Sequence, residues 1–467
     1  MKRLFPIALL VACAGEARGP VASTPPRATP SAPAASASGS APPKAGPPAR
    51  DARQAVVDAA LKRVAAAREL LPAGPVKSEV IGRTELLERM KRELKLDLEP
   101  PLIQGTTELL FAFGSAGPDL DYVGSLLSLL GTQLAGFYDP RDKEMVLLDD
   151  LGTDIEQATL WHELVHALQD QHYDLKRLMK WEPGRGDALA AVQSLAEGDA
   201  MSGMLEVSLK AAGRSALDLP DGMLSSSMAM LEAMPEIAAV PRLLKRSIVA
   251  PYADGLAFVH ALRRSGGWAA VDAAWRAPPS TTEQIIHPDK FLVHELSDPL
   301  APVTPPPAGP SDAVYRDVLG EQALRLAFEE WVPNATAAEA ASGWASDAIA
   351  VFATGEQRAV ALHVRYDDEA HAKRGFEAIA RGALRSESEN WAGDRPAPFV
   401  PAATAAPATK RGEVCQVRPL RGAFAAVRRG RDVGVALGPY RRSGAVTHAD
   451  GDCPAALRWA NSIATAK

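Results

Sequence analysis

The sequence predicts an α+β protein, in which a mostly helical domain with a small upstream sheet is followed by a small domain of two ββα units. Three observations support this prediction. Apolar stretches with helical periodicity dominate residues 51–298, and two short β-prone runs flank a turn at residues 139–142. From residue 313 onward, β-prone and helical stretches alternate. A chain of 467 residues is long enough for two or three domains.

The composition is that of a folded protein that does not bind nucleic acid. Hydrophobic residues make up 47% of the chain and charged residues 23%, and the net charge is −6. No dense run of Lys and Arg offers the basic stripe that binding to phosphate backbones requires. No apolar run is long enough to span a bilayer as a helix. We therefore expect no nucleic-acid partner and no membrane-spanning helix.

The N-terminal residues 1–13, MKRLFPIALLVAC, have the basic start, apolar stretch and small residues of a secretory signal. Their end, LVAC, resembles the bacterial lipobox, in which the signal peptide is cleaved before a cysteine that carries the lipid. We expect an exported lipoprotein that faces the periplasm or cell exterior and is anchored only through Cys13. Secretion without a lipid is the alternative. Residues 14–50 are rich in Pro, Ala and Ser and predict a disordered tether.

Residues 51–298 form the predicted helical domain. The stretch LAGFYDPRDKEMVLLDD, residues 134–150, predicts a hairpin that turns at Asp139-Pro140-Arg141-Asp142. From Ile155 to Trp275 helices dominate, and the pattern is interrupted at 181–187 and 217–222. Upstream of the hairpin we expect a strand at 76–81 and helices at 51–71, 84–94, about 106–113 and about 120–130.

The rest of the chain predicts a linker at residues 299–312 and a C-terminal α+β domain at residues 313–467. Residues 314–332 are expected to form a helix. Two rounds of strand, strand and helix should then build a small sheet that helices cover on one face. The expected strands lie at 348–354, at 358–366 and, as a pair, within 415–438, and the expected helices lie at 369–384 and 453–465.

The cysteines support export. Once Cys13 is acylated, Cys415 and Cys453 remain as an even pair in the C-terminal region. An oxidising compartment would allow them to form a disulfide. Two buried free thiols are the alternative.

The stretch LWHELVHALQDQHYDL, residues 160–175, carries the strongest functional signal. Residues four apart on a helix are offset by about 40° and by about 6 Å along the axis, so His162 and His166 can point at one ion. Glu163 lies beside them, close enough to act on a water molecule at that ion. This is the H-E-x-x-H pattern of zinc sites, in which two histidines bind the metal and the glutamate is the general base. We therefore expect Zn²⁺ as the cofactor.

Zinc needs a third protein ligand, and two residues compete for this place. His172 stands where metzincins carry their third histidine, but Gln169 replaces the glycine at which their chain turns. Because the residues between favour a continuous helix, His172 should lie about 9 Å beyond His166, too far for the ion. Glu197, in ALAAVQSLAEGDAMSGML, is the stronger candidate, since an antiparallel second helix could present its carboxylate.

With HELVH and EGDA, the chain resembles the gluzincin superfamily of zinc metallopeptidases, especially small, mostly uncharacterised bacterial proteins of this kind. The resemblance covers residues 76 to 292 approximately. It implies a zincin-like fold for the helical domain, with a glutamate from the next long helix completing the metal site. Thermolysin-type gluzincins orient the first histidine with an Asp four residues after that glutamate. Position 201 is Met here, so the orienting role is either vacant or passes to Asp199 or Asp170.

The resemblance also implies roles for residues around the metal. In these peptidases an edge strand before the metal helix pairs with the substrate backbone, and the hairpin at 134–150 is placed to supply it. An ordinary hairpin that covers the core is the alternative. A His or Tyr commonly stabilises the oxyanion, and His287 or Tyr252 could take that role. Each could equally be a hydrogen-bonded structural residue. The histidines without ligand spacing are expected to be structural: His260, His294, His363, His371 and His448.

Together these observations predict a zinc metalloendopeptidase of the cell envelope that acts on a peptide or protein substrate. Zinc would activate water for attack on the peptide carbonyl, and Glu163 would carry the proton to the leaving amine. No G-x-S-x-G motif is present, and neither later cysteine has the context of a nucleophile. Two alternatives remain: a zinc-binding lipoprotein that recognises partners without proteolysis, and an envelope scaffold with a degenerate site.

Overall fold

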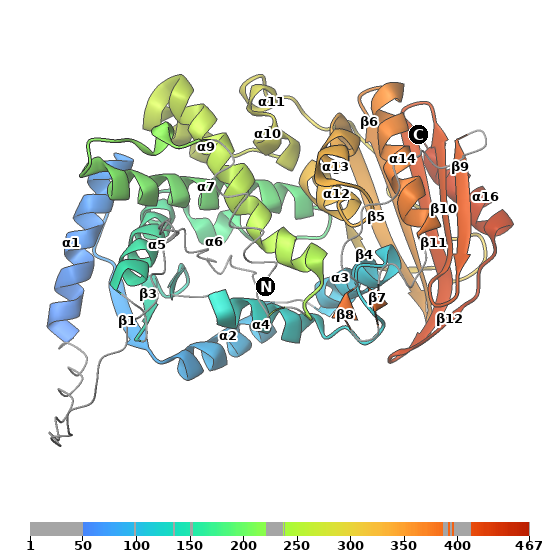
Figure 1. Ribbon diagram of the computed structural model, residues 1–467, viewed down its shortest axis with the longest axis horizontal. Coiled ribbons are helices and arrows are strands. Elements are labelled where there is room, and N and C mark those ends of the chain that lie inside the picture. Colours follow the sequence, from blue (N-terminus) through green and yellow to red (C-terminus); the bar gives the residue numbers. More distant parts are fainter. Residues whose placement is uncertain are drawn as a thin grey trace, which may run out of the picture.

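The computed structural model has a mixed α+β architecture, with helices and a small sheet at one end and a large sheet at the other (Figure 1). Among the described residues, no helix has the length and apolar character to cross a membrane. The predicted signal peptide with Cys13 and the predicted tether before residue 50 lie outside the described residues. The structure describes residues 50–97, 100–133, 136–149, 153–220, 237, 239–385, 391–392, 395–396 and 412–466.

The elements predicted upstream of the metal-binding motif are present. Strand β1 pairs in parallel with β3, and β3 pairs with β2 in the predicted hairpin. The strand order β1-β3-β2 makes β2 an edge strand. The elements are α1 (Arg50–Arg68), β1 (Lys77–Ile81), α2 (Arg83–Asp97), α3 (Pro100–Phe113), α4 (Tyr122–Gln133), β2 (Gly136–Asp139) and β3 (Glu144–Leu148).

Long helices follow the hairpin, as predicted. The motif helix runs without a break through His172, because the residues after His166 are good helix formers. The longest helix has non-helical angles at Gly266 and Gly267, where two helices meet at a kink. The elements are α5 (Thr153–Tyr173), α6 (Leu175–Leu178), α7 (Gly186–Lys210), the 3₁₀ helix η1 (Ala216–Asp218), α9 (Arg242–Arg276), α10 (Thr282–Ile286) and α11 (Pro288–Leu292).

Helices α7 and α9 approach each other at two glycines. A Cβ atom on Gly198 would lie 2.1 Å from the backbone of Gly255, and a Cβ on Gly255 would lie 1.9 Å from the carbonyl oxygen of Ser194. Only glycine leaves room for backbones at this distance. This crossing matters for the site, because Gly198 directly follows Glu197 on α7.

The C-terminal region contains a seven-stranded sheet with the order β4-β5-β6-β11-β10-β9, and β12 pairs with β11. A disulfide joins Cys415 on β9 to Cys453 at the start of α16. The elements are β4 (Asp312–Asp317), α12 (Gly320–Phe328), α13 (Asn334–Ala341), β5 (Trp344–Thr354), β6 (Gln357–Tyr366), α14 (Glu369–Leu384), β7 (Trp391–Ala392), β8 (Arg395–Pro396), β9 (Glu413–Arg418), β10 (Gly422–Arg429), β11 (Asp432–Ser443), β12 (Val446–Ala449) and α16 (Cys453–Ala464).

Two predictions for this region were wrong in detail. Residues 314–332 are not one helix, because residues 314–317 belong to β4 and helix α12 begins only at Gly320, whose φ is 75°. Residues 413–443 contain three strands, β9, β10 and β11, where two were predicted. The predicted rounds of strands followed by helices α14 and α16 are otherwise present.

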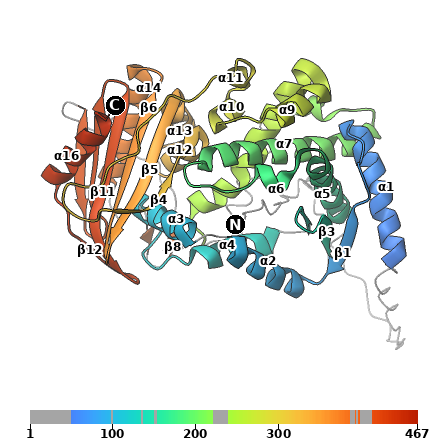
Figure 2. The same cartoon turned by 180° about the vertical axis from the view of Figure 1, so that it is seen from behind.

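Helices cover both faces of this sheet, not one as predicted (Figures 1 and 2). Alternate residues of β5 show the reason. Ile349 and Val351 pack in one buried cluster with α14, whereas Ala350 and Phe352 pack in another with α16. Strands that are apolar on both faces require cover on both sides.

The helical region packs directly against the large sheet. Arg421 donates from Nε to the carbonyl oxygen of Phe111 at the end of α3, at 2.6 Å, and its guanidinium lies over the Phe111 ring. The carbonyl end of a helix favours such a cation. Phe113 and Trp331 extend the contact into a core that both regions share. The segment 299–312 therefore connects regions that pack together.

We expect Gly255→Ala to destabilise the fold. The intrinsic preference of a helix would favour alanine by ~1 kcal/mol. The clash with Ser194 opposes this and should cost roughly 1–3 kcal/mol. Thermal unfolding followed by circular dichroism measures the change. Gly74→Ala is the control, because a Cβ there meets no atom within 4 Å; an equal or higher melting temperature for Gly255→Ala would contradict the close crossing.

Candidate metal centre

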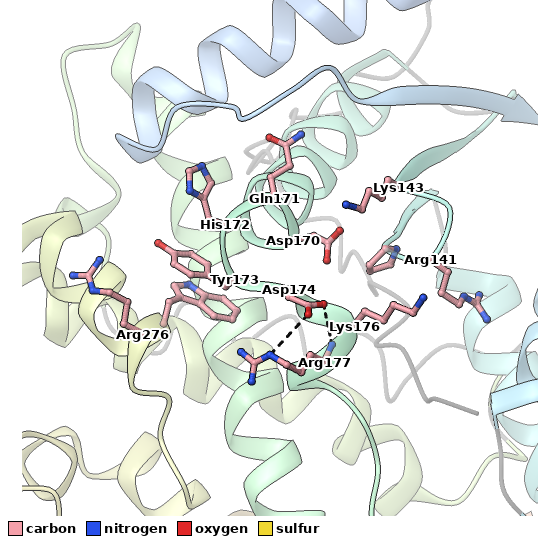
Figure 3. Close-up of a pocket in the computed structure, with 12 residues that line it drawn as sticks. Arg141, Lys143, Asp170, Gln171, His172, Tyr173, Asp174, Lys176, Arg177 and Arg276 are labelled. Carbon is pink, nitrogen blue, oxygen red and sulfur yellow. Dashed lines mark hydrogen bonds and ion pairs between the residues drawn. The ribbon is translucent and has the colours of Figure 1, made fainter. Parts of the chain in front are cut away.

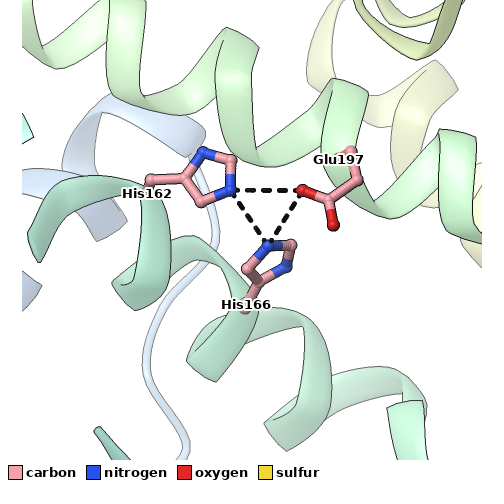
Figure 4. Close-up of side chains that lie close together, drawn as sticks. All are labelled: His162, His166 and Glu197. Atoms are coloured by element: carbon pink, nitrogen blue, oxygen red, sulfur yellow. Dashed lines mark hydrogen bonds and ion pairs between the residues drawn. The ribbon is translucent and has the colours of Figure 1, made fainter. Parts of the chain in front are cut away.

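Helices α5 and α7 bring His162, His166 and Glu197 together (Figure 4). Nε2 of His162 lies 3.1 Å from Nε2 of His166 and 3.2 Å from Oε2 of Glu197. His166 Nε2 lies 3.4 Å from the same carboxylate oxygen. Three ligand atoms from two helices thus point at one small volume.

The two helices run antiparallel, as predicted, and this orientation places Glu197. Gln169 on α5 donates from Nε2 to the carbonyl oxygen of Ala196 at 3.0 Å. One helical turn earlier on α5, Val165 lies against Gly203, which comes later on α7. Residue numbers therefore increase in opposite directions along the two helices, and Glu197 faces the helical turn between His162 and His166.

The donor set fits a zinc ion. The ligand atoms of His162, His166 and Glu197 all lie within 4.8 Å of one another. Two imidazoles and one carboxylate form a common ligand set of catalytic zinc sites. Oε1 of Glu197 and Nδ1 of His162 are buried and have no hydrogen-bond partner in the described part of the chain. A buried oxygen without a partner is costly unless a ligand compensates it.

The pKa shifts of Glu197 and His166 favour an ion pair between these two side chains. Burial would raise the pKa of Glu197, but the charge of His166 and hydrogen bonds from both imidazoles outweigh it and lower the pKa to about 2. Burial likewise opposes charge on His166, yet Glu197 raises the pKa of His166 to about 9. For His162, burial dominates and lowers the pKa. A metal ion would therefore have to displace a proton from His166.

Glu163 lies beside the cluster and is completely buried. Its Oε2 accepts a hydrogen bond of 2.7 Å from the backbone N–H of Tyr138 on edge strand β2, and its Oε1 has no partner within the described part of the chain. Burial raises the pKa of Glu163 to about 8. One carboxylate oxygen is thus anchored by the hairpin while the other is available to exchange a proton.

Asp199 supports His166 through an intermediate residue that the sequence analysis did not identify. Nδ1 of His166 lies 2.8 Å from Oε1 of Gln169, and Nε2 of Gln169 donates to Asp199 at 3.1 Å. Asp199 is held in turn by the indole N–H of Trp275 and the guanidinium of Arg68. The available signal was spacing, because Gln169 follows His166 by three positions and so shares its helix face.

Asp170 does not contact either histidine. Its carboxylate accepts hydrogen bonds from the Tyr138 hydroxyl, at 3.1 Å, and from the backbone N–H of Leu175. Since Tyr138 also donates its backbone N–H to Glu163, Asp170 and Glu163 are linked through the hairpin. The expected contact of Asp199 or Asp170 with His162 is not made. Asp170 lies eight residues after His162, or about 12 Å along the helix axis. Asp199 is bonded instead to Arg68, Gln169 and Trp275.

The structure separates the remaining candidates. Tyr252 on α9 stacks on His162 with ring centroids 6.0 Å apart. His172 lies outside the cluster and contacts the carbonyl oxygen of Leu71 at 2.7 Å. His287, between α10 and α11, bonds to Glu321 at 3.0 Å.

His287 is remote from the cluster. Its partner Glu321 follows Gly320, and Gly320 lies against Asp187 at the start of α7. Asp187 also accepts a hydrogen bond from Thr282 on α10, the helix that precedes His287. Asp187 is ten residues before Glu197 on α7, or about 15 Å along the helix axis. The structure therefore brings Tyr252, and not His287, to the metal ligands.

Comparisons with known proteins give little further information. Residues 310–448 match a family described as a domain of unknown function (DUF8575). No curated protein matches the chain. A solved structure from Chloroflexus aurantiacus, described as "a putative hydrolase with a novel fold", shares 16% identity with a TM-score of 0.30, over 53% of this chain and 92% of that one. The matched family covers the large sheet and leaves out the residues of the metal centre.

Proposed function

We propose that this protein is a zinc-dependent metallopeptidase that hydrolyses peptide bonds. The observation that carries the proposal is the convergence of His162, His166 and Glu197 from two helices, with Glu163 buried beside them. The helix of H-E-x-x-H followed by a glutamate ligand is also the arrangement that the gluzincin resemblance implies. The same resemblance suggests a zincin-like fold for the helical region.

The three ligands would hold zinc, and Glu163 would move the proton. A bound zinc ion supplies Lewis-acid chemistry, which polarises a carbonyl group and makes water more acidic. Oε1 of Glu163 has no partner in the described part of the chain and could take a proton from the attacking water, while Oε2 accepts a hydrogen bond from the N–H of Tyr138. Glu163 then returns the proton to the nitrogen of the leaving amine. Burial favours the protonated carboxyl during this transfer, and a nearby cation favours its ionised form.

Tyr252 is the candidate for stabilising the oxyanion. Its ring lies nearly parallel to that of His162, with an interplanar angle of 20°. The hydroxyl group of a tyrosine so placed can donate to negative charge that develops on the substrate oxygen. Support for His162 by ring packing is the structural alternative.

A second candidate function is zinc binding without proteolysis. The side chains of His162, Glu163 and Glu197 are completely buried, and a hydrogen bond from strand β2 occupies one oxygen of Glu163. Structural zinc sites are closed in this way, whereas catalytic sites keep a position open for water. In this function the protein would recognise partners in the cell envelope.

The proposed location is the cell envelope, with the chain anchored through a lipid on Cys13. The lipobox-like sequence LVAC supports the anchor. The disulfide between Cys415 and Cys453 supports an oxidising compartment.

Zinc content tests the ligand set. We expect the purified wild type to hold one zinc ion and Glu197→Ala to lose most of it, because removing one of three ligands leaves only the two imidazoles. His172→Ala should keep the ion, since His172 lies outside the cluster. Elemental analysis after dialysis gives the stoichiometry. Full zinc in Glu197→Ala together with loss in His172→Ala would reverse the assignment.

Cleavage of casein or of a peptide library tests the reaction. Glu163→Gln keeps the shape of the side chain but cannot accept the proton, so the rate should fall by roughly 10²–10⁴-fold. Its zinc content should match the wild type, which separates loss of the base from loss of the metal. Equal residual cleavage by both proteins would remove the peptidase assignment and leave the non-proteolytic zinc protein.

Tyr252→Phe separates catalysis from packing. The ring and its stacking on His162 remain, so zinc content should not change. If the hydroxyl stabilises the oxyanion, kcat should fall by about 10²–10³-fold with little change in KM. Unchanged kcat would assign Tyr252 to packing alone.

A further inference from the structure

A cavity of about 550 Å³ lies at the C-terminal end of α5 (Figure 3). The turn between β2 and β3, the end of α5, helix α6 and the end of α9 line it. Its volume falls within the range of ~300–1,000 Å³ that is usual for ligand sites. Tyr173 stacks on Trp275 along one wall, with ring centroids 5.1 Å apart. The cavity thus offers both polar and aromatic surface.

The lining of the cavity has an excess of positive charge. Two of its cations are paired, Arg141 with Asp139 and Arg177 with Asp174. In the part of the chain that the structure describes, Lys143, Lys176 and Arg276 take part in no ion pair, but the charge of Lys143 acts on Asp170, where it opposes the rise in the pKa of that carboxyl that burial causes. The charged lining consists of five cations and two carboxylates: Arg141, Lys143, Lys176, Arg177 and Arg276 against Asp170 and Asp174.

The cavity and the metal centre are connected through shared residues. Asp170 lines the cavity one helical turn after His166, about 6 Å along the axis. Tyr138 links the two places, because its hydroxyl bonds to Asp170 and its backbone N–H bonds to Glu163. The side chain of His166 is 7% exposed, whereas those of His162 and Glu197 are 0% exposed. The ligand nearest to the cavity is therefore the one that reaches solvent.

We propose that this cavity binds acidic side chains of the substrate, close to the peptide bond that is cleaved. The proposal rests on the proposed peptidase function and adds a preference for acidic peptides. Lys176 and Arg276 are the specificity-determining residues, because their charges are not already neutralised. A guanidinium group can bind a carboxylate through two parallel hydrogen bonds, and the stacked rings of Tyr173 and Trp275 can pack against the stem of the side chain.

Peptide binding tests the proposal without requiring cleavage. Zinc-loaded, full-length Glu163→Gln protein is mixed with two labelled peptides of equal length, one with glutamates and one with glutamines at the same positions. Fluorescence anisotropy at low salt should show about tenfold tighter binding of the acidic peptide, the effect of two exposed charge contacts. Added salt should reduce this preference, because mobile ions screen the contacts.

Charge reversal locates the preference. Lys176→Glu combined with Arg276→Glu, in the same background, should abolish it. The matched control, Lys373→Glu with Arg458→Glu, changes the net charge equally on exposed positions of α14 and α16 and should leave it intact. Equal binding of the two peptides, or an equal effect of both double variants, would overturn the proposal. Displacement of the acidic peptide by inorganic phosphate but not by glutarate would also overturn it, in favour of a phosphate site.

The two proposals fail in different ways. A preference for the acidic peptide that depends on Lys176 and Arg276, without any cleavage by the wild type, supports the cavity and removes the peptidase. Cleavage of both peptides with equal kcat/KM, and no difference in binding, supports the peptidase and removes the cavity.

Discussion

The close crossing of α7 and α9 is the constraint on which the metal centre depends. Gly198 and Gly255 let the two backbones come into contact, and each helix carries a residue of the candidate site next to this contact. Glu197 precedes Gly198, and Tyr252 lies one helical turn before Gly255 on the face that meets His162. A side chain at either glycine would push the helices apart, which would withdraw the carboxylate from the histidines of α5. The contact between two glycines, which have no side chains, thus sets the position of polar side chains in the candidate site.

A network of buried polar side chains supports this geometry. His166 bonds to Gln169, which bonds to Asp199, and Asp199 pairs with Arg68 near the end of α1. The charge of Arg68 is shared with Asp272 on α9. Each residue of this network bonds to the next, which low-dielectric surroundings favour, although Nη1 of Arg68 has no hydrogen-bond partner in the described part of the chain. The chain of contacts ties three helices to the orientation of one imidazole, so a change at Arg68 can reach His166 without touching it.

Local patterns in the sequence predicted the parts of the structure that depend on neighbours in the chain. The strand β1, the hairpin β2–β3 and the unbroken α5 follow from short-range periodicity and turn residues, as does the face shared by His162 and His166. The segment 314–317 shows the limit, because it continues a plausible helical pattern but belongs to β4, which pairs with β5. The helical layer on the second face of the large sheet was not predicted. The patterns of β5 and β6 indicate strands whether one or both faces of the sheet are covered. The bond between Gln169 and His166 could not be predicted from the sequence. The side chain of Gln169 is oriented by its hydrogen bonds to Ala196 and Asp199, so its direction depends on the position of α7.

The burial of the cluster and the openness of the neighbouring cavity are two consequences of the same arrangement. A zinc ligand set holds its charges best when water is excluded, whereas a peptide must enter from solvent. Strand β2 lies next to both places, because the backbone N–H of Tyr138 bonds to Glu163 and its hydroxyl group bonds to Asp170, which lines the cavity. A substrate strand that pairs with the edge of β2 would compete with Glu163 for the N–H of Tyr138. Under the proposed peptidase function, release of that bond would free the second carboxylate oxygen of Glu163 when the substrate binds, so the edge strand would couple substrate binding to the state of Glu163.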